Sequence, residues 1–322
     1  MTSSTRKAAT LIGRLRYTWD PEEYARAAAR MLGSRMLRYA RDLRWKLVQR
    51  GFELRNRLYA ARPVRLSAGS VPVWLVPVGA TATDVWWSGR YERHELGLVL
   101  RGVQDGTTFL DVGANAGIYA LAVAARYPDV HVVAVEPAKS TFEILQRNVR
   151  LNGLSHVTLI HAAIAEYEGQ AELQVNAAGK DGLNTLGAPT HPDSNVVSKE
   201  TVPVLTLDKL VRRHDLRNVS AIKVDVEGGE LAVFNGGQDL LRADDAPFIL
   251  FEGFSFCTQG FGYHPVTLVW LLESWGYVTL ALDSVTGKLR RRGARNGRYD
   301  SMYIAIKPGH PFFDQAMAEA GQ

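Results

Sequence analysis

The alternation of apolar and polar positions is most informative between residues 107 and 137. A short apolar run at 109–110 is followed by a turn with two glycines at 113–117. The alanine-rich segment 118–126 favours helix, and a second apolar run covers 130–135. This order predicts strand, turn, helix and strand, which is one βαβ unit with a parallel pair of strands.

The remaining pattern extends this unit into an α/β domain. A stretch with two prolines at 71–78 fits only an edge strand or a hairpin arm. The polar segment 169–203 predicts a β-hairpin with a long loop, and long loops in compact domains are usually functional or disordered. The other predicted helices are 140–151, 205–214 and 265–275, and the other predicted strands are 157–161, 221–227, 248–252, 277–282 and 299–306. The basic residues 288–292 between the last two strands are expected to form an exposed hairpin tip.

Composition indicates an ordinary globular protein. The chain has 322 residues, of which 46% are hydrophobic and 22% charged, and this length is enough for a substantial core. The single cysteine, Cys257, rules out an internal disulfide framework and favours a reducing compartment. No signal-type segment and no apolar run of membrane-spanning length is present, so we expect a cytoplasmic protein.

Charge is unevenly distributed along the chain. Residues 1–66 carry 16 Lys and Arg against 5 Asp and Glu, a net +11, so the rest carries 22 against 28, a net −6. Because the body is mildly acidic, we expect no nucleic-acid partner. The basic segment 20–60 starts with the helix-start pattern Asp20-Pro21-Glu22-Glu23 and carries an apolar stripe that includes Leu47 and Leu54. It predicts either a helix that contacts a membrane or an acidic partner, or a helix whose stripe covers the folded body.

The glycine turn and the carboxylates around it predict a nucleoside site. Ligands of open α/β sheets bind at the carboxyl ends of the strands, where Asp111, the turn and Glu136 fall. Glu136 is placed to accept hydrogen bonds from a ribose diol. The spacing between the two glycines is G-x-x-x-G rather than the dinucleotide pattern. A carboxylate at Asp111 would repel a pyrophosphate but suits an ammonium group, so S-adenosylmethionine is favoured over NAD. Small residues after the strand 157–161, including Ala163, leave room for an adenine ring.

A second group of polar side chains predicts a catalytic mouth at the same edge of the sheet. In the strand at 221–227, period two places Lys223, Asp225 and Glu227 on one side. Glu252 ends the next strand, and such a row of charges in a central sheet must be satisfied either by a structural network or by catalysis. Asp225 or Glu227 is the expected general base, with His264 and His94 as further candidates. A divalent metal held by Asp225 and Glu252 is compatible with the spacing but not required by it, so no metal ligands are assigned, and the sequence does not decide whether a metal assists. The aromatic pair Trp86-Trp87 fits either a substrate wall or core packing.

These motifs resemble those of the FkbM-type methyltransferases. The matching stretches, in order, are FLDVGANAGIYAL, AVEP, NVRLN, LTLDKL, IKVDVEGGE and FILFEG, within residues 70–308. The resemblance implies a class I methyltransferase (Rossmann-like) fold with a seven-stranded, mostly parallel sheet. The basic helical N-terminal extension, expected from the charge pattern, matches nothing typical of this family. It also implies S-adenosyl-L-methionine as cofactor and O-methylation of a hydroxyl on a small molecule, polyketide or saccharide. By motif match, the resemblance implies that Asp111, Gly113, Asn115 and Gly117 hold the methionine part of the donor and that Glu136 holds its ribose, and it matches Asp225, Glu227 and Glu252 to typical positions of the family. The full set of expected donor-binding residues adds Ala114, Pro137 and Ala163, and the expected catalytic set adds His264.

The expected domain organisation is an extension at 1–66, a methyltransferase domain at 67–310 and a tail at 311–322. Two other classes stay open from the residues alone. One is an NAD-dependent oxidoreductase on the same fold, and the other is a non-catalytic scaffold that uses the basic helix. The oligomeric state and the identity of the acceptor do not follow from the sequence.

Overall fold

The computed structural model describes residues 46–54, 56–57, 62–68, 71–291 and 301–321. The chain separates into two compact units, Met1–Leu58 and Tyr59–Gln322. Within the described residues, no helix is both long enough and apolar enough to cross a membrane.

The described part of the first unit is helical over residues 46–54 and 56–57. Val48 and Phe52 are its buried side chains, whereas Leu47 and Leu54 of the predicted apolar stripe are 59% and 56% exposed. The predicted stripe therefore does not coincide with the buried face of this helix. The expected helix start at Asp20 lies outside the described residues.

The second unit is built on a single eight-stranded sheet. Its strands are β3 (Thr108–Val112), β4 (His131–Val135), β5 (Val157–Ile160), β9 (Val219–Val224), β10 (Phe248–Gly253), β11 (Val278–Leu282), β12 (Leu289–Arg291) and β13 (Ser301–Ile306), in the order β12-β11-β13-β10-β9-β3-β4-β5. The five neighbours from β10 to β5 are parallel, while β13 is antiparallel to β10 and β11 is antiparallel to β13. The mostly parallel sheet of the prediction is therefore confirmed.

The eighth strand, β12, corrects part of the prediction of an exposed hairpin tip: Lys288, Arg290 and Arg291 are exposed as expected, but part of this segment is a strand. Residues 289–291 pair with β11 in antiparallel register, and Leu289 is only 3% exposed. One buried leucine and the unpaired edge of β11 are enough to draw the basic segment into the sheet, because an edge strand offers free backbone hydrogen-bonding groups.

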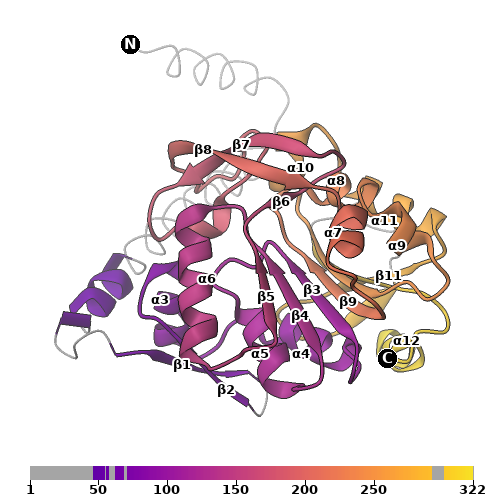
Figure 1. The fold of residues 1–322 in the computed structure, drawn as a ribbon, viewed down its shortest axis with the longest axis horizontal. Helices are drawn as coiled ribbons and strands as arrows, with labels where there is room; N and C mark the ends of the chain where they lie inside the picture. Colours follow the sequence, from indigo (N-terminus) through magenta and orange to yellow (C-terminus); the bar gives the residue numbers. More distant parts are fainter. Residues whose placement is uncertain (1–45, 55, 58–61, 69–70, 292–300, 322) are drawn as a thin grey trace, which may run out of the picture. The chain divides into compact units, whose positions relative to one another are not determined.

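Helices cover both faces of the sheet. The first group is α4 (Arg93–Gly102), α5 (Ile118–Arg126) and α6 (Lys139–Leu151), and the second is α7 (Leu207–Arg213), α8 (Glu230–Asn235), α9 (Gln238–Arg242) and α11 (Val266–Ser274). Figure 1 shows the two groups on opposite sides of the strands. The unit β3-α5-β4 is the predicted βαβ unit, with its two strands paired in parallel.

The period-two pattern of the central strands decides what each face holds. Leu110 of β3 and Ile222 and Val224 of β9 belong to one apolar core with α7, α8, α9 and α11. The alternate residues Asp111 and Lys223 point to the other face, where α5 lies. A charged pair is therefore placed inside the sheet, as the sequence predicted for Lys223.

The remaining elements close the ends of this unit. β1 (Val64–Ala68) and β2 (Val71–Leu75) form an antiparallel hairpin, followed by α3 (Gly79–Ser88), so the segment predicted as an edge strand or a hairpin arm is a hairpin arm. β6 (Ala163–Ile164), β7 (Gly169–Asn176) and β8 (Val196–Leu205) form a small second sheet, which Figure 1 shows above the large one. Because β6 follows β5 after two residues, this small sheet stands at the carboxyl end of β5. The short helices η1 (Asp181–Leu183), α10 (Ser255–Thr258) and η2 (Gln259–Phe261) lie in loops.

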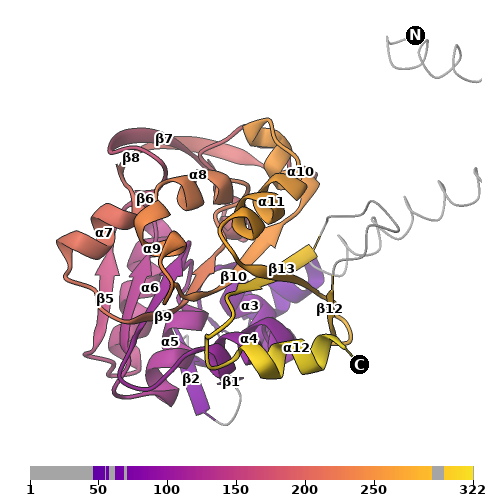
Figure 2. The same cartoon turned by 90° about the vertical axis from the view of Figure 1, so that its right-hand side faces the viewer.

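The chain ends in α12 (Phe313–Ala320), which packs beside β12 in Figure 2. Ala316 in this helix is fully buried, so the segment expected as a tail contains a packed helix. At the other end, the expected boundary after residue 66 falls inside β1, and the two units divide after Leu58.

Candidate active site

A cavity of about 690 Å³ opens at the carboxyl ends of β3, β4, β9 and β10. Residues of the small sheet and its loop form its far wall, including Leu173, Leu183 and Leu186. This volume is in the range of ligand pockets, and its position is the usual ligand site of an open parallel sheet. Of the predicted donor-binding residues, Gly113, Ala114, Asn115, Glu136, Pro137 and Ala163 line the cavity.

The turn after β3 can be built only with glycine at position 113. Its φ is +77°, and a Cβ atom there would lie 1.8 Å from the backbone oxygen of Asp225. The β3 turn and the turn after β9 therefore touch backbone to backbone. Gly117, with φ +86°, begins α5, and a Cβ there would meet Leu145 at 2.3 Å. Gly117 does not line the cavity, so its role is to let α5 pack against α6.

Glu136 organises the turn from the end of β4. One carboxylate oxygen accepts the Asn115 N–H at 2.9 Å, and the other accepts the Ala138 N–H at 3.0 Å. The side chain is 5% exposed, and burial raises its pKa to about 7 although these two hydrogen bonds act in the opposite direction. Each oxygen keeps a lone pair, so Glu136 can still accept from a diol in the cavity.

Asp111 lies beneath the turn and not in the cavity wall. Its carboxylate is 0% exposed and accepts the Ala120 N–H at 3.0 Å, which satisfies a free amide in the first turn of α5. The direct contact with the methionine part of a donor expected from the sequence is not available to a side chain in this position. Asp111 acts on the site through the backbone that it holds.

Lys223 connects Asp111 to the second turn. Its ammonium lies 3.7 Å from the Asp111 carboxylate and 3.2 Å from that of Asp225, and it donates to the Gly113 carbonyl at 2.7 Å. Burial lowers the pKa of Lys223, but the charges of Asp225 and Asp111 outweigh it and the pKa is raised. The ammonium therefore stays charged and holds the two turns together.

The turn after β9 presents acidic side chains to the cavity. β9 ends at Val224, so Asp225 and Glu227 leave the strand, and Glu227 adopts a left-handed conformation with φ +54°. Such a conformation in a non-glycine residue is strained and concentrates at functional sites. Glu230 secures the turn by accepting the N–H groups of Val226 and Gly228. Asp225 and Glu227 both line the cavity, as predicted, although by a turn and not by strand alternation.

Two more carboxylates complete this end of the cavity. Glu252 at the end of β10 lines it, as the sequence predicted, and burial raises its pKa well above the ordinary value. Glu92 was missed because it stands outside every predicted strand. The Tyr119 hydroxyl donates to the Glu92 carboxylate at 2.6 Å. Burial, together with the negative charge of Asp225, raises the pKa of Glu92 to about 7. The left-handed φ of +35° at Glu92 was not readable from sequence.

Two sequence candidates lie away from the cavity. His264 is exposed, and its Nδ1 accepts the Val266 N–H at the start of α11, so its catalytic assignment is not supported by its position. The pair Trp86-Trp87 lies on α3, with Trp87 51% exposed, and neither residue lines the cavity. Tyr91, four residues beyond Trp87 (91 − 87), forms the aromatic wall expected of them.

The residues present fit a phosphate-free nucleoside donor. The N–H groups of Asn115, Ala116 and Ala120 already donate to Glu136, Asn115 Oδ1 and Asp111. A pyrophosphate would need such groups free and would face buried carboxylates, whereas a sulfonium and an ammonium are attracted by them. The wall beside Glu136 consists of small residues, including Ala162 and Ala163, which leaves room for a flat base.

Comparisons with known proteins agree with this geometry. Residues 111–279 match the family model described as "Methyltransferase FkbM domain". "Methyltransferase 1" of Beauveria bassiana is 28% identical over 149 residues, covering 42% of this chain and 60% of that protein. "Hexuronic acid methyltransferase AglP" of Haloferax volcanii is 27% identical over 155 residues, covering 48% of this chain and 59% of that protein. The chain thus spans about 60% of the length of these curated relatives.

The likeness to solved structures is weaker. The O-methyltransferase TomG from Streptomyces achromogenes, solved with S-adenosylmethionine, is 12% identical with a TM-score of 0.37, covering 68% of this chain and 79% of that chain. The family match covers more than half of the chain and begins at the residue that ends the predicted motif strand, Asp111. The chain belongs to the FkbM family of S-adenosylmethionine-dependent methyltransferases.

Proposed function

We propose that this protein transfers the methyl group of S-adenosylmethionine to a hydroxyl of a saccharide or another small hydroxylated molecule. The observation that carries the proposal is the composition of one cavity. The glycine turn and Glu136 line one end, and the carboxylates of Glu92, Asp225, Glu227 and Glu252 line the other. The glycine turn and Glu136 suit the methyl donor, and a carboxylate at the other end can accept the proton of an alcohol.

The chemistry required of the chain is alignment and proton removal. The acceptor oxygen forms a bond to the methyl carbon while the carbon–sulfur bond breaks and its electron pair stays on sulfur. The hydroxyl proton passes to a carboxylate. Holding donor and acceptor in line supplies much of the rate, and the cavity walls exclude water. Asp225 is the proposed base, because its side chain is 28% exposed at the cavity and Lys223 fixes it at 3.2 Å.

A sugar acceptor is supported by the relative named a hexuronic acid methyltransferase. A uronic acid offers two kinds of oxygen, hydroxyl and carboxylate. A carboxylate acceptor needs no base, since it is already deprotonated at neutral pH. The charge of Asp225 at the acceptor end would also repel an anionic group placed beside it. Both features favour a hydroxyl as the methylated oxygen.

The test is methyl transfer from labelled S-adenosylmethionine to a panel of neutral sugars, uronic acids and phenols. We expect label in an ether, which survives mild alkaline hydrolysis. Label released by alkali would identify a methyl ester and contradict hydroxyl transfer. Absence of transfer to every acceptor, with tight donor binding retained, would favour the non-catalytic scaffold.

The base assignment has its own test in Asp225→Asn. We expect turnover to fall by about 10²–10⁴ while donor affinity changes by less than about tenfold, because the amide keeps the shape but not the basicity. Glu143→Gln, on the exposed side of α6, is the matched charge control. Normal turnover in a folded Asp225→Asn protein would move the role to Glu92 or Glu227.

Family membership decides against the NAD-dependent alternative. The cytoplasmic location stays a prediction. Contact of residues 20–60 with a membrane surface or an acidic partner, and the expected absence of a nucleic-acid partner, also stay predictions.

A further inference from the structure

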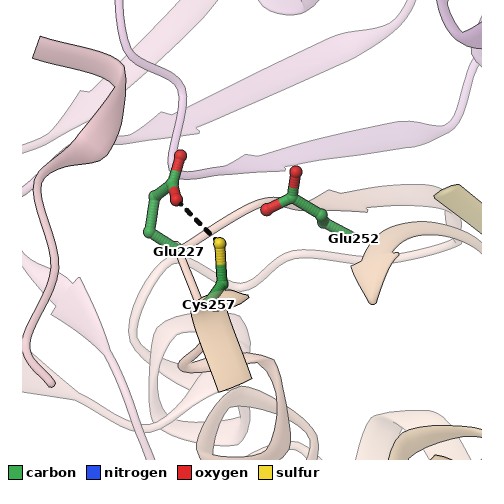
Figure 3. A group of neighbouring side chains, drawn as sticks. All are labelled: Glu227, Glu252 and Cys257. Atoms are coloured by element: carbon green, nitrogen blue, oxygen red, sulfur yellow. Dashed lines mark hydrogen bonds between the residues drawn. The ribbon is translucent and has the colours of Figure 1, made fainter. Parts of the chain in front are cut away.

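Three potential metal ligands converge beside the acceptor end of the cavity. The donor atoms of Glu227, Glu252 and Cys257 all lie within 4.8 Å of one another. Figure 3 shows the Glu252 carboxylate pointing toward the other two side chains, and the Cys257 thiol donates to a Glu227 oxygen at 3.1 Å. The three residues come from the turn after β9, the end of β10 and α10.

One of these ligand groups is buried without a partner. The Glu252 Oε2 atom is buried and accepts no hydrogen bond. Buried carboxylate oxygens almost always have a hydrogen-bond partner. An unpartnered carboxylate oxygen beside the ligand atoms of Glu227 and Cys257 therefore indicates a missing ion. Among the described residues, no Lys or Arg forms an ion pair with Glu227 or Glu252, because Lys223 is engaged by Asp111 and Asp225. Within the part of the chain that the structure describes, these two acidic side chains therefore have no cationic partner.

The backbone brings these groups together at a position where only glycine fits. Gly228 has φ +101°, and a Cβ atom there would lie 2.4 Å from the Cys257 carbonyl oxygen. The preceding residue, Glu227, has a left-handed φ of +54°, and its carboxylate accepts from the Cys257 thiol. Thr185 from the hairpin loop donates to the Glu227 carbonyl at 2.9 Å and secures this conformation from outside. These contacts fix the turn after β9 against α10.

We propose that Glu227, Glu252 and Cys257 bind a divalent transition metal ion of the zinc type. A thiolate with two carboxylates suits Zn²⁺, and the soft sulfur disfavours Mg²⁺ and Ca²⁺. Ligand atoms on a tetrahedral zinc are about 3.3–3.8 Å apart, given bonds of about 2.0–2.3 Å. Side-chain movements of about 1 Å would therefore close the site. Three protein ligands leave a fourth position, and Glu227 and Glu252 both line the cavity, so that position faces the acceptor.

The role of the metal rests on the proposed hydroxyl methylation, but the metal site itself does not. A hydroxyl coordinated at the fourth position would have a lowered pKa and lose its proton to Asp225 more readily. The alkoxide oxygen then bonds to the methyl carbon, and the sulfonium leaves as a neutral thioether. The cation also neutralises two of the carboxylates that surround the acceptor.

The test uses Co²⁺ added to the purified full-length chain without donor or acceptor. The chain has one cysteine, so a thiolate-to-cobalt charge-transfer band can arise only from Cys257. We expect the band to saturate at one Co²⁺ per chain and to disappear when Zn²⁺ is added in competition. Cys257→Ser should lose the band, and Glu252→Gln should weaken Co²⁺ binding at least about tenfold, since a ligand is removed. Glu143→Gln should bind Co²⁺ as the native chain does.

A chain that shows no band and binds no Co²⁺ by calorimetry would overturn the metal site, and Glu227 and Glu252 would then share a proton. Retention of full Co²⁺ affinity in Glu252→Gln would also overturn the proposed ligand set. Measuring methyl transfer after treatment with a chelator distinguishes the metal-site proposal from the proposed methyltransferase function. Co²⁺ binding without any methyl transfer would contradict the proposed function alone, and chelator-insensitive transfer without Co²⁺ binding would contradict the metal alone.

Discussion

Gly113 is the position where the site depends most directly on a missing side chain. Gly113→Ala would combine an unfavourable φ of +77° with a contact of 1.8 Å to the Asp225 carbonyl. We expect unfolding free energy to fall by more than about 2 kcal/mol and donor binding to be lost, because the two turns must separate. Gly153→Ala is the control, since Gly153 has a similar φ of +66° with nothing within 4 Å of the added Cβ. We expect Gly153→Ala to lower the free energy of unfolding, measured by denaturant titration, by only about 1 kcal/mol. Equal losses in the two variants would show that the turns can separate freely.

Glu136 predicts a pH dependence of stability. Its pKa rises from 4.5 to about 7 on folding because of burial. Below pH about 4.5 both states hold the proton, and between about 4.5 and 7 only the folded state does, so stability falls as pH rises through this window. This contribution is at most about 3 kcal/mol. We expect Glu136→Gln to show a shallower decline of unfolding free energy from pH 5 to 7.5 in denaturant titrations.

Glu230, whose pKa burial also raises to about 7, contributes a decline of the same sign in both proteins. The difference between the native chain and Glu136→Gln therefore isolates Glu136. Parallel curves for the two proteins would mean that Glu136 is ionised in the folded state throughout the window.

The hairpin β7–β8 and its loop form one wall of the cavity, and the buried Asn176 side chain links three segments of the hairpin and its loop. Asn176 donates to the Leu183 carbonyl at 2.6 Å and accepts from the Ser194 hydroxyl and the Asn195 N–H at 2.9 and 2.6 Å. We expect Asn176→Ala to increase hydrogen exchange of the loop amides about tenfold to a hundredfold, since about 1.4–3 kcal/mol of buried hydrogen bonding is lost.

The same change should weaken donor or acceptor binding, because loop residues including Asp181 and Thr185 line the cavity. Thr201→Ala, at an exposed position on β8, is the control and should leave both properties unchanged. Loop exchange that is identical in Asn176→Ala and the native chain would show that the hairpin is held by other contacts.

For the chain as a whole, the basic N-terminal unit is the part whose purpose the methyltransferase domain does not explain. Leu47 and Leu54 are more than half exposed on its described helix, beside basic residues such as Lys46 and Arg50. We predict salt-sensitive binding of the full-length chain to anionic vesicles in sedimentation assays. Replacing both leucines with alanine should reduce the bound fraction at least about tenfold, through lost apolar burial.

Leu151→Ala, at a leucine that is 39% exposed on α6, is the matched control and should bind vesicles as the native chain does. Binding that neither salt nor the double substitution reduces would contradict a surface contact through this helix.

Local pattern was sufficient for the central parallel strands and for most of the donor end of the site. Residues 107–137 could be assigned from alternation, glycine spacing and chain breaks, because each of these signals acts between near neighbours in sequence. Asn115, Glu136 and Ala163 line the cavity as expected, since the ends of parallel strands must meet at one edge. The same logic brought Asp225 and Glu252 together.

Contacts between distant segments decided the rest. The motif predicted that the Asp111 carboxylate contacts the donor. In the folded chain this carboxylate instead accepts the Ala120 N–H of α5, and Lys223 lies between Asp111 and Asp225. Glu92 and Cys257 joined the site from a loop and a short helix that no sequence spacing relates to β9. Periodicity specifies which side of an element a residue occupies, but the distance between side chains on separate elements depends on how those elements pack. That packing exists only in the folded chain.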